Sequence, residues 1–183
     1  MSANVVTQLQ VKSHNSPDEK RRPDKSEIDI VSVGDSTIGR FSFEPGWRWS
    51  ECIKPVVHTD SCQNSHVGFC VSGRLTVERG GSVIARIDEP GALVGEMSVL
   101  TGSPNSATVR ADGQAIVRVV ADAMRFVMRQ PEIGLHIATV LAQRLDATSA
   151  VLSALRSEAG TDVAEQSRLG RIVAALFTGK AGK

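Results

Sequence analysis

Tyrosine, long apolar runs and an excess of charge are missing from this sequence. It contains no tyrosine, and aromatic residues make up only 4% of the chain. Lysine and arginine number 21 against 20 acidic residues, so the formal net charge is +1 at pH 7. Such a balanced chain has no broad basic surface to attract nucleic acid or an anionic membrane. No apolar run approaches the roughly 20 residues of a membrane-spanning helix. We therefore expect neither direct nucleic-acid binding nor membrane insertion.

Cysteine is also scarce. Cys52, Cys62 and Cys70 form no close pair motif, so reduced thiols in a cytoplasmic protein are the default expectation. Residues 1–10 lack the basic flank and long apolar core of a signal peptide. Nucleophile motifs are absent too, since Ser98 does not stand in a nucleophile elbow. These absences favour a cytoplasmic protein that is not an enzyme.

What the sequence does contain is a series of short β-rich runs separated by turn residues. The runs cover residues 28–33, 37–43, 66–71, 75–79, 82–87 and 115–120. Many short strands with regular turn signals are typical of a sandwich or barrel. Trp47 and Trp49 flank Arg48 at strand spacing, which places both indoles on one face. We interpret them as core residues, with a ligand-stacking wall as the alternative.

The pattern becomes helical after the last of these runs. Asp122 is expected to cap a short helix over 123–129, and Pro131 suits the first position of a long helix ending at Glu158. Four regions follow: a mobile tail over 1–26, a mainly β barrel over 27–121, a helical hinge and dimerisation helix over 122–160, and a short helix and tail over 161–183.

The run from Gly95 to Arg110 carries the clearest chemistry. Gly95 allows a tight backbone bend, and residues 96–100 can form one short helical turn. Free N–H groups at a helix start suit an anion. The Glu96 carboxylate can accept hydrogen bonds from sugar hydroxyls, while Ser106 and the Ala107 amide can hold phosphate oxygens.

This run resembles the phosphate-binding cassette of the cyclic nucleotide-binding domain family. The matching residues are Gly95, Glu96, Leu100, Pro104, Ser106, Ala107, Thr108 and Val109. The resemblance extends over Val67 to Leu155 and implies a β jelly-roll with a cyclic AMP or cyclic GMP site and no required cofactor. The implied ligand-binding residues are Gly95, Glu96, Met97, Ser98, Asn105, Ser106, Ala107 and Thr108.

Asn105 departs from the family pattern at the position that matters most. The family has an arginine there, which pairs with the cyclic phosphate, whereas asparagine is a neutral donor. A charge-assisted hydrogen bond to phosphate is about twice as strong as a neutral one. We therefore expect cyclic nucleotide binding to be weakened or lost.

The front half of the chain also resembles a small bacterial cupin family, which shares the jelly-roll fold. The matching stretches are Phe43–Ser50, Thr59–Gln63 and His66–Gly68. In that alignment Asp60, Cys62 and His66 stand where the cupin motif supplies metal ligands, and a borderline metal accepts such a mixed set. The second cupin motif supplies another histidine, but none occurs between His66 and His136. We expect no bound metal, and keep a cupin-type metal protein or enzyme as the alternative.

The long predicted helix carries apolar residues at alternating steps of three and four. They are Ala138, Leu141, Leu145, Thr148, Leu152, Leu155 and Ala159. A repeat of 3.5 residues is the signature of a coiled coil. The helix over 132–159 is therefore expected to form a homodimer, and a second apolar edge leaves open that it also lies on its own barrel. The sequence as a whole favours a regulatory or sensory module, with a scaffold that binds no ligand as a further possibility.

Overall fold

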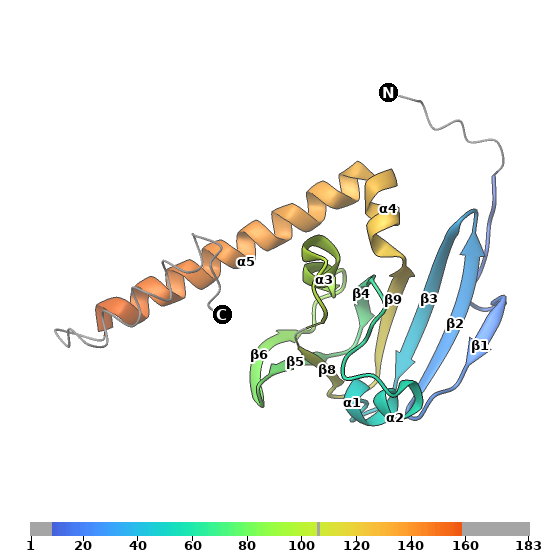
Figure 1. The fold of residues 1–183 in the computed structure, drawn as a ribbon, viewed down its shortest axis with the longest axis horizontal. Helices are drawn as coiled ribbons and strands as arrows, with labels where there is room; N and C mark the ends of the chain where they lie inside the picture. Colours follow the sequence, from blue (N-terminus) through green and yellow to red (C-terminus); the bar gives the residue numbers. More distant parts are fainter. Residues whose placement is uncertain (1–8, 106, 159–183) are drawn as a thin grey trace. The chain divides into compact units, whose positions relative to one another are not determined.

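The computed structural model describes residues 9–105 and 107–158 of the chain. The chain divides into two compact units, with the boundary between Pro131 and Glu132. The first unit contains the described strands and four short helices, and the described part of the second is a single long helix (Figure 1).

Nine described strands form two antiparallel sheets. The first sheet has the order β1-β2-β3-β9-β4-β7 and the second the order β6-β5-β8. The strand bounds are β1 Glu19–Arg21, β2 Ser26–Val33, β3 Ser36–Phe43, β4 His66–Ser72, β5 Leu75–Arg79, β6 Ser82–Ile87, β7 Leu93–Val94, β8 Thr108–Ala111 and β9 Ala115–Ala121. The prediction of a mainly β fold followed by helices is confirmed. Within the described residues the sheets stay open rather than closing into one barrel, since β6 and β7 each pair with a single neighbour.

The main apolar core draws on both sheets. Phe41 pairs with Val117 and Phe43 with Ala115 along β3 and β9, so these four side chains share one face of the first sheet. The same core includes Leu75 from the second sheet. Burial alternates along β9, which explains why the sequence pattern located this strand correctly.

The two tryptophans belong to this core, but not through a strand. The Trp47 ring stacks on Phe43 with 3.9 Å between ring centroids, and Trp49 is partly buried against the same cluster. Arg48, which lies between them, forms an isolated backbone β-bridge with Arg110 and is not part of a strand, and helix α1 begins at Trp49. The interpretation of both indoles as core residues is confirmed, whereas their placement on a strand is wrong.

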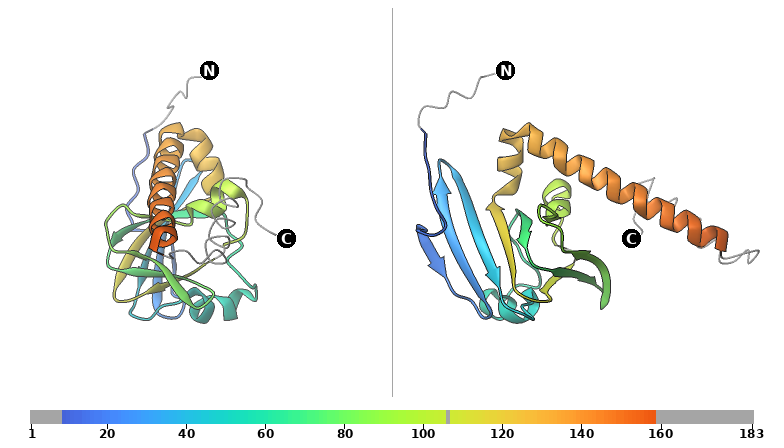
Figure 2. Two further views of the ribbon diagram at one scale, coloured as in Figure 1. Left: turned by 90° about the vertical axis from the view of Figure 1, so that its left-hand side faces the viewer. Right: turned by 180° about the vertical axis from the view of Figure 1, so that it is seen from behind.

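Four short helices accompany the sheets. Their bounds are α1 Trp49–Cys52, α2 Lys54–Val57, α3 Glu96–Thr101 and α4 Ala123–Arg129. Helices α1 and α2 lie at one end of the first sheet and α4 lies at the other (Figures 1 and 2). The bounds of α4 are those predicted, but Asp122 does not cap it: its φ is 50° and its side chain makes no capping hydrogen bond. The capping prediction was wrong because this residue takes a left-handed conformation, which redirects its side chain.

The N-terminal region differs from the mobile tail that we predicted for residues 1–26. Strand β1 pairs with β2 and extends the first sheet by one strand. Arg40 on β3 donates to the backbone oxygen of His14 and to the Asn15 side chain, each at 3.0 Å. Contacts between residues so far apart in the sequence leave no local apolar pattern, so the sequence did not predict that this segment is ordered. Residues 1–8 lie outside the described part.

Helix α5 spans Pro131–Glu158 and starts at the predicted proline. Six of the seven positions in the predicted dimer stripe lie in this helix, while Ala159 and the predicted features over 160–183 lie outside the described residues. Leu145 and Leu155 are about half exposed, at 47% and 48%. Among the described residues, no helix combines the length and apolar character that crossing a membrane requires.

Candidate functional site

The cassette begins at a glycine that no other residue could replace without strain. Gly95 has a φ of +87°, and a Cβ built on it would lie 2.7 Å from the backbone oxygen of His66. Any side chain would therefore both adopt an unfavourable backbone conformation and collide with β4. This close approach sets the start of α3 directly against the neighbouring strand.

Helix α3 is anchored on one side and open on the other. Val99 is buried in a second apolar cluster with Val67, Val120 and Ala123. Met97, on the opposite side, is 59% exposed. The Ser98 hydroxyl donates to the Gly95 backbone oxygen at 2.8 Å, so its hydrogen serves the turn. The helix start is thus held rigidly, with its outer face free of the core.

Glu96 is the most unusual side chain of the cassette. It is a carboxylate that opens a short helix, yet only 4% of it is exposed. Charged residues are seldom fully buried unless they are partnered. A buried carboxylate beside a helix start can accept hydrogen bonds from hydroxyl groups with little competition from water.

Asn105 faces the loop that precedes β4. Its Nδ2 donates to the backbone oxygen of Cys62 at 3.2 Å, which ties the cassette loop to residues 59–65. Ser106 lies outside the described residues, Ala107 is half-buried, and Thr108 begins β8. The structure therefore brings most of the predicted residues into one continuous loop and helix, without testing what they bind.

No cation of the cassette replaces the missing arginine. Residues 95–109 contain no lysine, arginine or histidine. Arg110, the next residue, lies 3.3 Å from Glu78 and 3.0 Å from Asp112, so its charge is already paired. Burial of the His66 imidazole lowers its pKa, which favours the neutral ring. Within residues 95–109, an anion would therefore meet only neutral donors.

The three residues of the possible cupin-type site do not come together. Cys62 Sγ lies 3.9 Å from His66 Nδ1, but the exposed Asp60 pairs with Lys54 at 3.2 Å. In the part of the chain that the structure describes, no cluster of three or more His, Cys, Asp or Glu side chains could hold a metal. The donor set therefore does not fit a metal centre.

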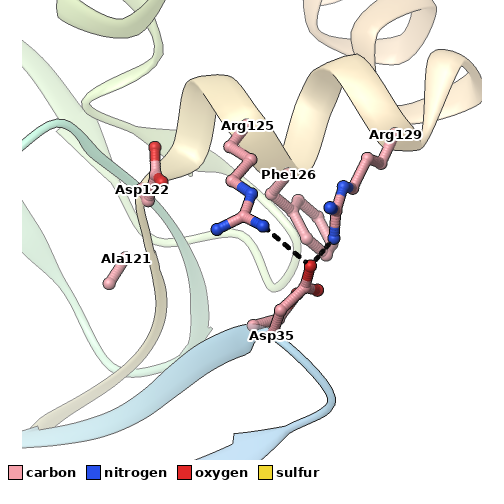
Figure 3. A pocket seen from close by; sticks show the side chains of 7 residues that line it. Asp35, Ala121, Asp122, Arg125, Phe126 and Arg129 are labelled. Atoms are coloured by element: carbon pink, nitrogen blue, oxygen red, sulfur yellow. Dashed lines mark hydrogen bonds and ion pairs between the residues drawn. The ribbon is translucent and has the colours of Figure 1, made fainter.

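Two hollows lie away from the cassette. One is lined by Asp35 of the β2–β3 turn and by Arg125 and Arg129 of α4 (Figure 3). The other lies at the ends of β2, β3 and β9, beside Lys25 and Gln114. Neither includes a cassette residue. Sequence reasoning missed the first cluster, although two arginines four residues apart on a predicted helix were a usable signal.

Comparison with known proteins gives a family match for the part of the chain that contains the cassette. Residues 56–130 match the model of the family described as cyclic nucleotide-binding domain. No curated protein matches the chain.

Three solved structures illustrate the similarity. The catabolite activator protein of Thermus thermophilus is 24% identical over 64% of this chain and 55% of that one, with a TM-score of 0.49. A cyclic nucleotide-binding domain from Methylobacillus flagellatus is 20% identical over 62% of each chain, with a TM-score of 0.45. Cyclic AMP-bound PfPKA-R is 19% identical over 64% of this chain and 37% of that one, with a TM-score of 0.47.

This chain covers 37% of PfPKA-R and 55% of the Thermus protein, so it spans only part of the length of either protein. The family match covers the loop before β4, the cassette and α4, and it ends before the part of the resemblance that was extended along α5. The resemblance is confirmed: residues 56–130 of this chain carry the sequence pattern of the cyclic nucleotide-binding domain family.

Proposed function

We propose that this protein is a regulatory or sensory module that does not catalyse a reaction, acts in the cytoplasm and binds a cyclic nucleotide weakly. The observation that carries the proposal is the family match over residues 56–130, which contains the cassette. The two sheets are the layers that a jelly-roll would have, and we include that topology in the proposal. No separate cofactor, nucleic acid or membrane is part of it.

In this proposal each cassette residue has a role. Glu96, buried at the start of α3, accepts hydrogen bonds from the ribose hydroxyls. The amides at the helix start, together with Ser106 and Ala107, donate to the cyclic phosphate. Met97, Ser98 and Thr108 complete the wall of the site.

The neutral Asn105 makes the binding weak for two reasons. It supplies no charge to the phosphate, and its amide already donates to the Cys62 oxygen. A ligand that recruits Asn105 must therefore break an existing hydrogen bond. The affinity should lie well below that of a site with an arginine at this position.

Calorimetric titration with cyclic AMP tests the role of Glu96. We expect weak, saturable binding to the native protein and a loss of about tenfold or more in Glu96→Gln, because hydrogen bonds to charged groups contribute about 1.5–3 kcal/mol. Glu44→Gln is the matched control, since Glu44 is an exposed carboxylate beside the second hollow. Equal affinity in native protein and Glu96→Gln would contradict the assigned role.

The proposal also includes a homodimer formed by α5. Leu141, Leu145, Leu152 and Leu155 follow the 3.5-residue repeat along the described helix. In water an isolated apolar stripe is unfavourable, and pairing with the same stripe of a second copy would bury it. The regulatory module would then act as a homodimer.

Two charged substitutions in the stripe should separate such a dimer. We expect Leu145→Asp with Leu152→Asp to sediment as a folded monomer, because each carboxylate would be buried unpaired in the interface. The control pair Gln143→Asp and Ala150→Asp changes exposed positions off the stripe and should leave the dimer intact. A native protein that sediments as a monomer at high concentration would rule out the dimer.

A further inference from the structure

The β2–β3 turn grips helix α4 through a single carboxylate. Asp35 Oδ2 accepts a hydrogen bond from Arg125 Nη2 at 3.0 Å and forms an ion pair with Arg129 Nη1 (Figure 3). The two arginines stand four residues apart, so they project from the same side of α4. Both interactions therefore connect one face of α4 to the same Asp35 oxygen.

The same turn is held on its other side by the N-terminal segment. The amide of Gly34, next to Asp35, donates to Gln10 Oε1 at 2.7 Å. Asp18 Oδ2 accepts from the Ser32 amide at 2.9 Å, and Arg40 bonds to residues 14 and 15. With a further backbone hydrogen bond from Asp18 to the Ile30 oxygen at 2.9 Å, residues 10–18 are bonded to the β2–β3 hairpin at more than three places.

Helix α4 continues this connection to the cassette. Ala123 is buried against Val99 of α3, and Phe126 packs on the same apolar cluster. The helix is bounded by Asp122, with a φ of 50°, and by Gln130, which is also outside helical geometry. Helix α4 is therefore a short rigid unit between two non-helical residues, attached to the hairpin by charge and to the cassette by apolar packing.

We propose that residues 10–18 form a strap that holds α4 against the cassette helix through the Gly34–Asp35 turn, and that release of the strap loosens α4. The hydrogen bond from Gly34 fixes the turn, and the turn presents Asp35 to both arginines. A partner that binds the strap, or a protease that removes it, would release the strap and so weaken the packing of α4 against α3. The device operates whether or not a nucleotide occupies the cassette, so its test is independent of the proposed function.

Hydrogen exchange of the α4 amides in the full-length protein tests the strap. Asp35→Asn should speed exchange over residues 126–130 about threefold to tenfold, the range expected when two half-exposed ion pairs are lost. Glu19→Gln is the matched control, because it removes an exposed pair with Arg21 on β1 and should leave α4 unchanged. If the exchange rates of α4 are unchanged in Asp35→Asn, Asp35 does not hold α4 in place.

The strap itself is tested by Gln10→Ala. This change should speed exchange at Gly34 and, to a smaller extent, in α4, with no further effect on α4 when it is combined with Asp35→Asn. That dependence is what a relay through the turn requires. If Gln10→Ala leaves α4 unchanged, or acts equally in both backgrounds, the strap does not work through Asp35.

Discussion

Replacement of Asn105 by arginine should strengthen cyclic AMP binding by at least about tenfold. The phosphate of a cyclic nucleotide carries one negative charge, and no cationic residue lies within the cassette over 95–109. A helix start contributes about 0.3–1 kcal/mol to an exposed anion, and up to roughly 2 when it is partly buried. A hydrogen bond from a charged donor adds about 1.5–3 kcal/mol. Since each 1.4 kcal/mol is about a factor of ten, the arginine should gain about tenfold to a hundredfold.

The Cys62 oxygen must be considered in the same experiment. Asn105→Arg also removes the hydrogen bond that ties the cassette to the loop before β4. Asn105→Ala removes this bond without adding charge, so it is the matched control, and it should not gain affinity. In Asn105→Arg, a second change of Glu96→Gln should abolish the gain. Sub-micromolar native binding, or no gain in a folded Asn105→Arg variant, would contradict the assignment of Asn105 to the phosphate position.

Replacement of Arg40 by methionine should destabilise the protein by about 3 kcal/mol at neutral pH, because it removes the nearer of the two cations that compensate a buried carboxylate. Asp29 on β2 is 1% exposed, and its Oδ2 accepts from Arg40 at 2.6 and 3.1 Å. Lys20, the second cation, lies 3.3 Å from Oδ1 and would compensate only in part. Methionine retains most of the aliphatic volume of arginine, so the lost charge dominates the effect.

The pH dependence of this destabilisation follows from Asp29. Burial by itself would raise the pKa of this carboxyl, but the hydrogen bonds and charges of Arg40 and Lys20 outweigh burial, so the pKa lies below its usual value. A lowered pKa stabilises the folded state above the unfolded pKa of about 3.9, and this stabilisation is lost as the pH falls through the folded pKa. The deficit of Arg40→Met should therefore be largest near pH 7 and shrink below about pH 4.

Urea unfolding at several pH values measures this effect. Arg118→Met is the matched control, because Arg118 lies opposite Arg40 on the neighbouring strand and is exposed. We expect little change there, and a partial recovery when Asp29→Asn is combined with Arg40→Met. A deficit that does not vary with pH would mean that lost packing, rather than the unpaired Asp29 charge, accounts for the destabilisation.

Strand positions could be predicted well because they depend on local signals, namely short β-rich runs bounded by turn residues. The runs at 75–79 and 82–87 coincide with β5 and β6, and the Gly80–Gly81 pair joins them as a hairpin. The bounds of α4 could likewise be predicted from the change in period. The sequence alone is therefore enough to locate elements that depend on neighbouring residues.

The elements that were missed depend on contacts between distant residues. Strand β1 is three exposed charged residues, and only its pairing with β2 makes it a strand. Helices α1 and α2 are each four residues long, too short for a periodic pattern. For the site, the cassette order could be predicted, but not that Asn105 would bond to Cys62, which lies 43 residues earlier.

Chemical-shift mapping of the amides during titration with millimolar cyclic AMP tests the central claim most directly. The claim is that the cassette over residues 95–108 is a cyclic nucleotide site of low affinity. It predicts saturable shifts concentrated at Gly95–Thr101 and at residues 105–108, and with Glu96→Gln the same shifts should need at least about tenfold more cyclic AMP. Shifts confined to the hollow beside Lys25 and Gln114, or no shifts in the folded protein, would contradict it.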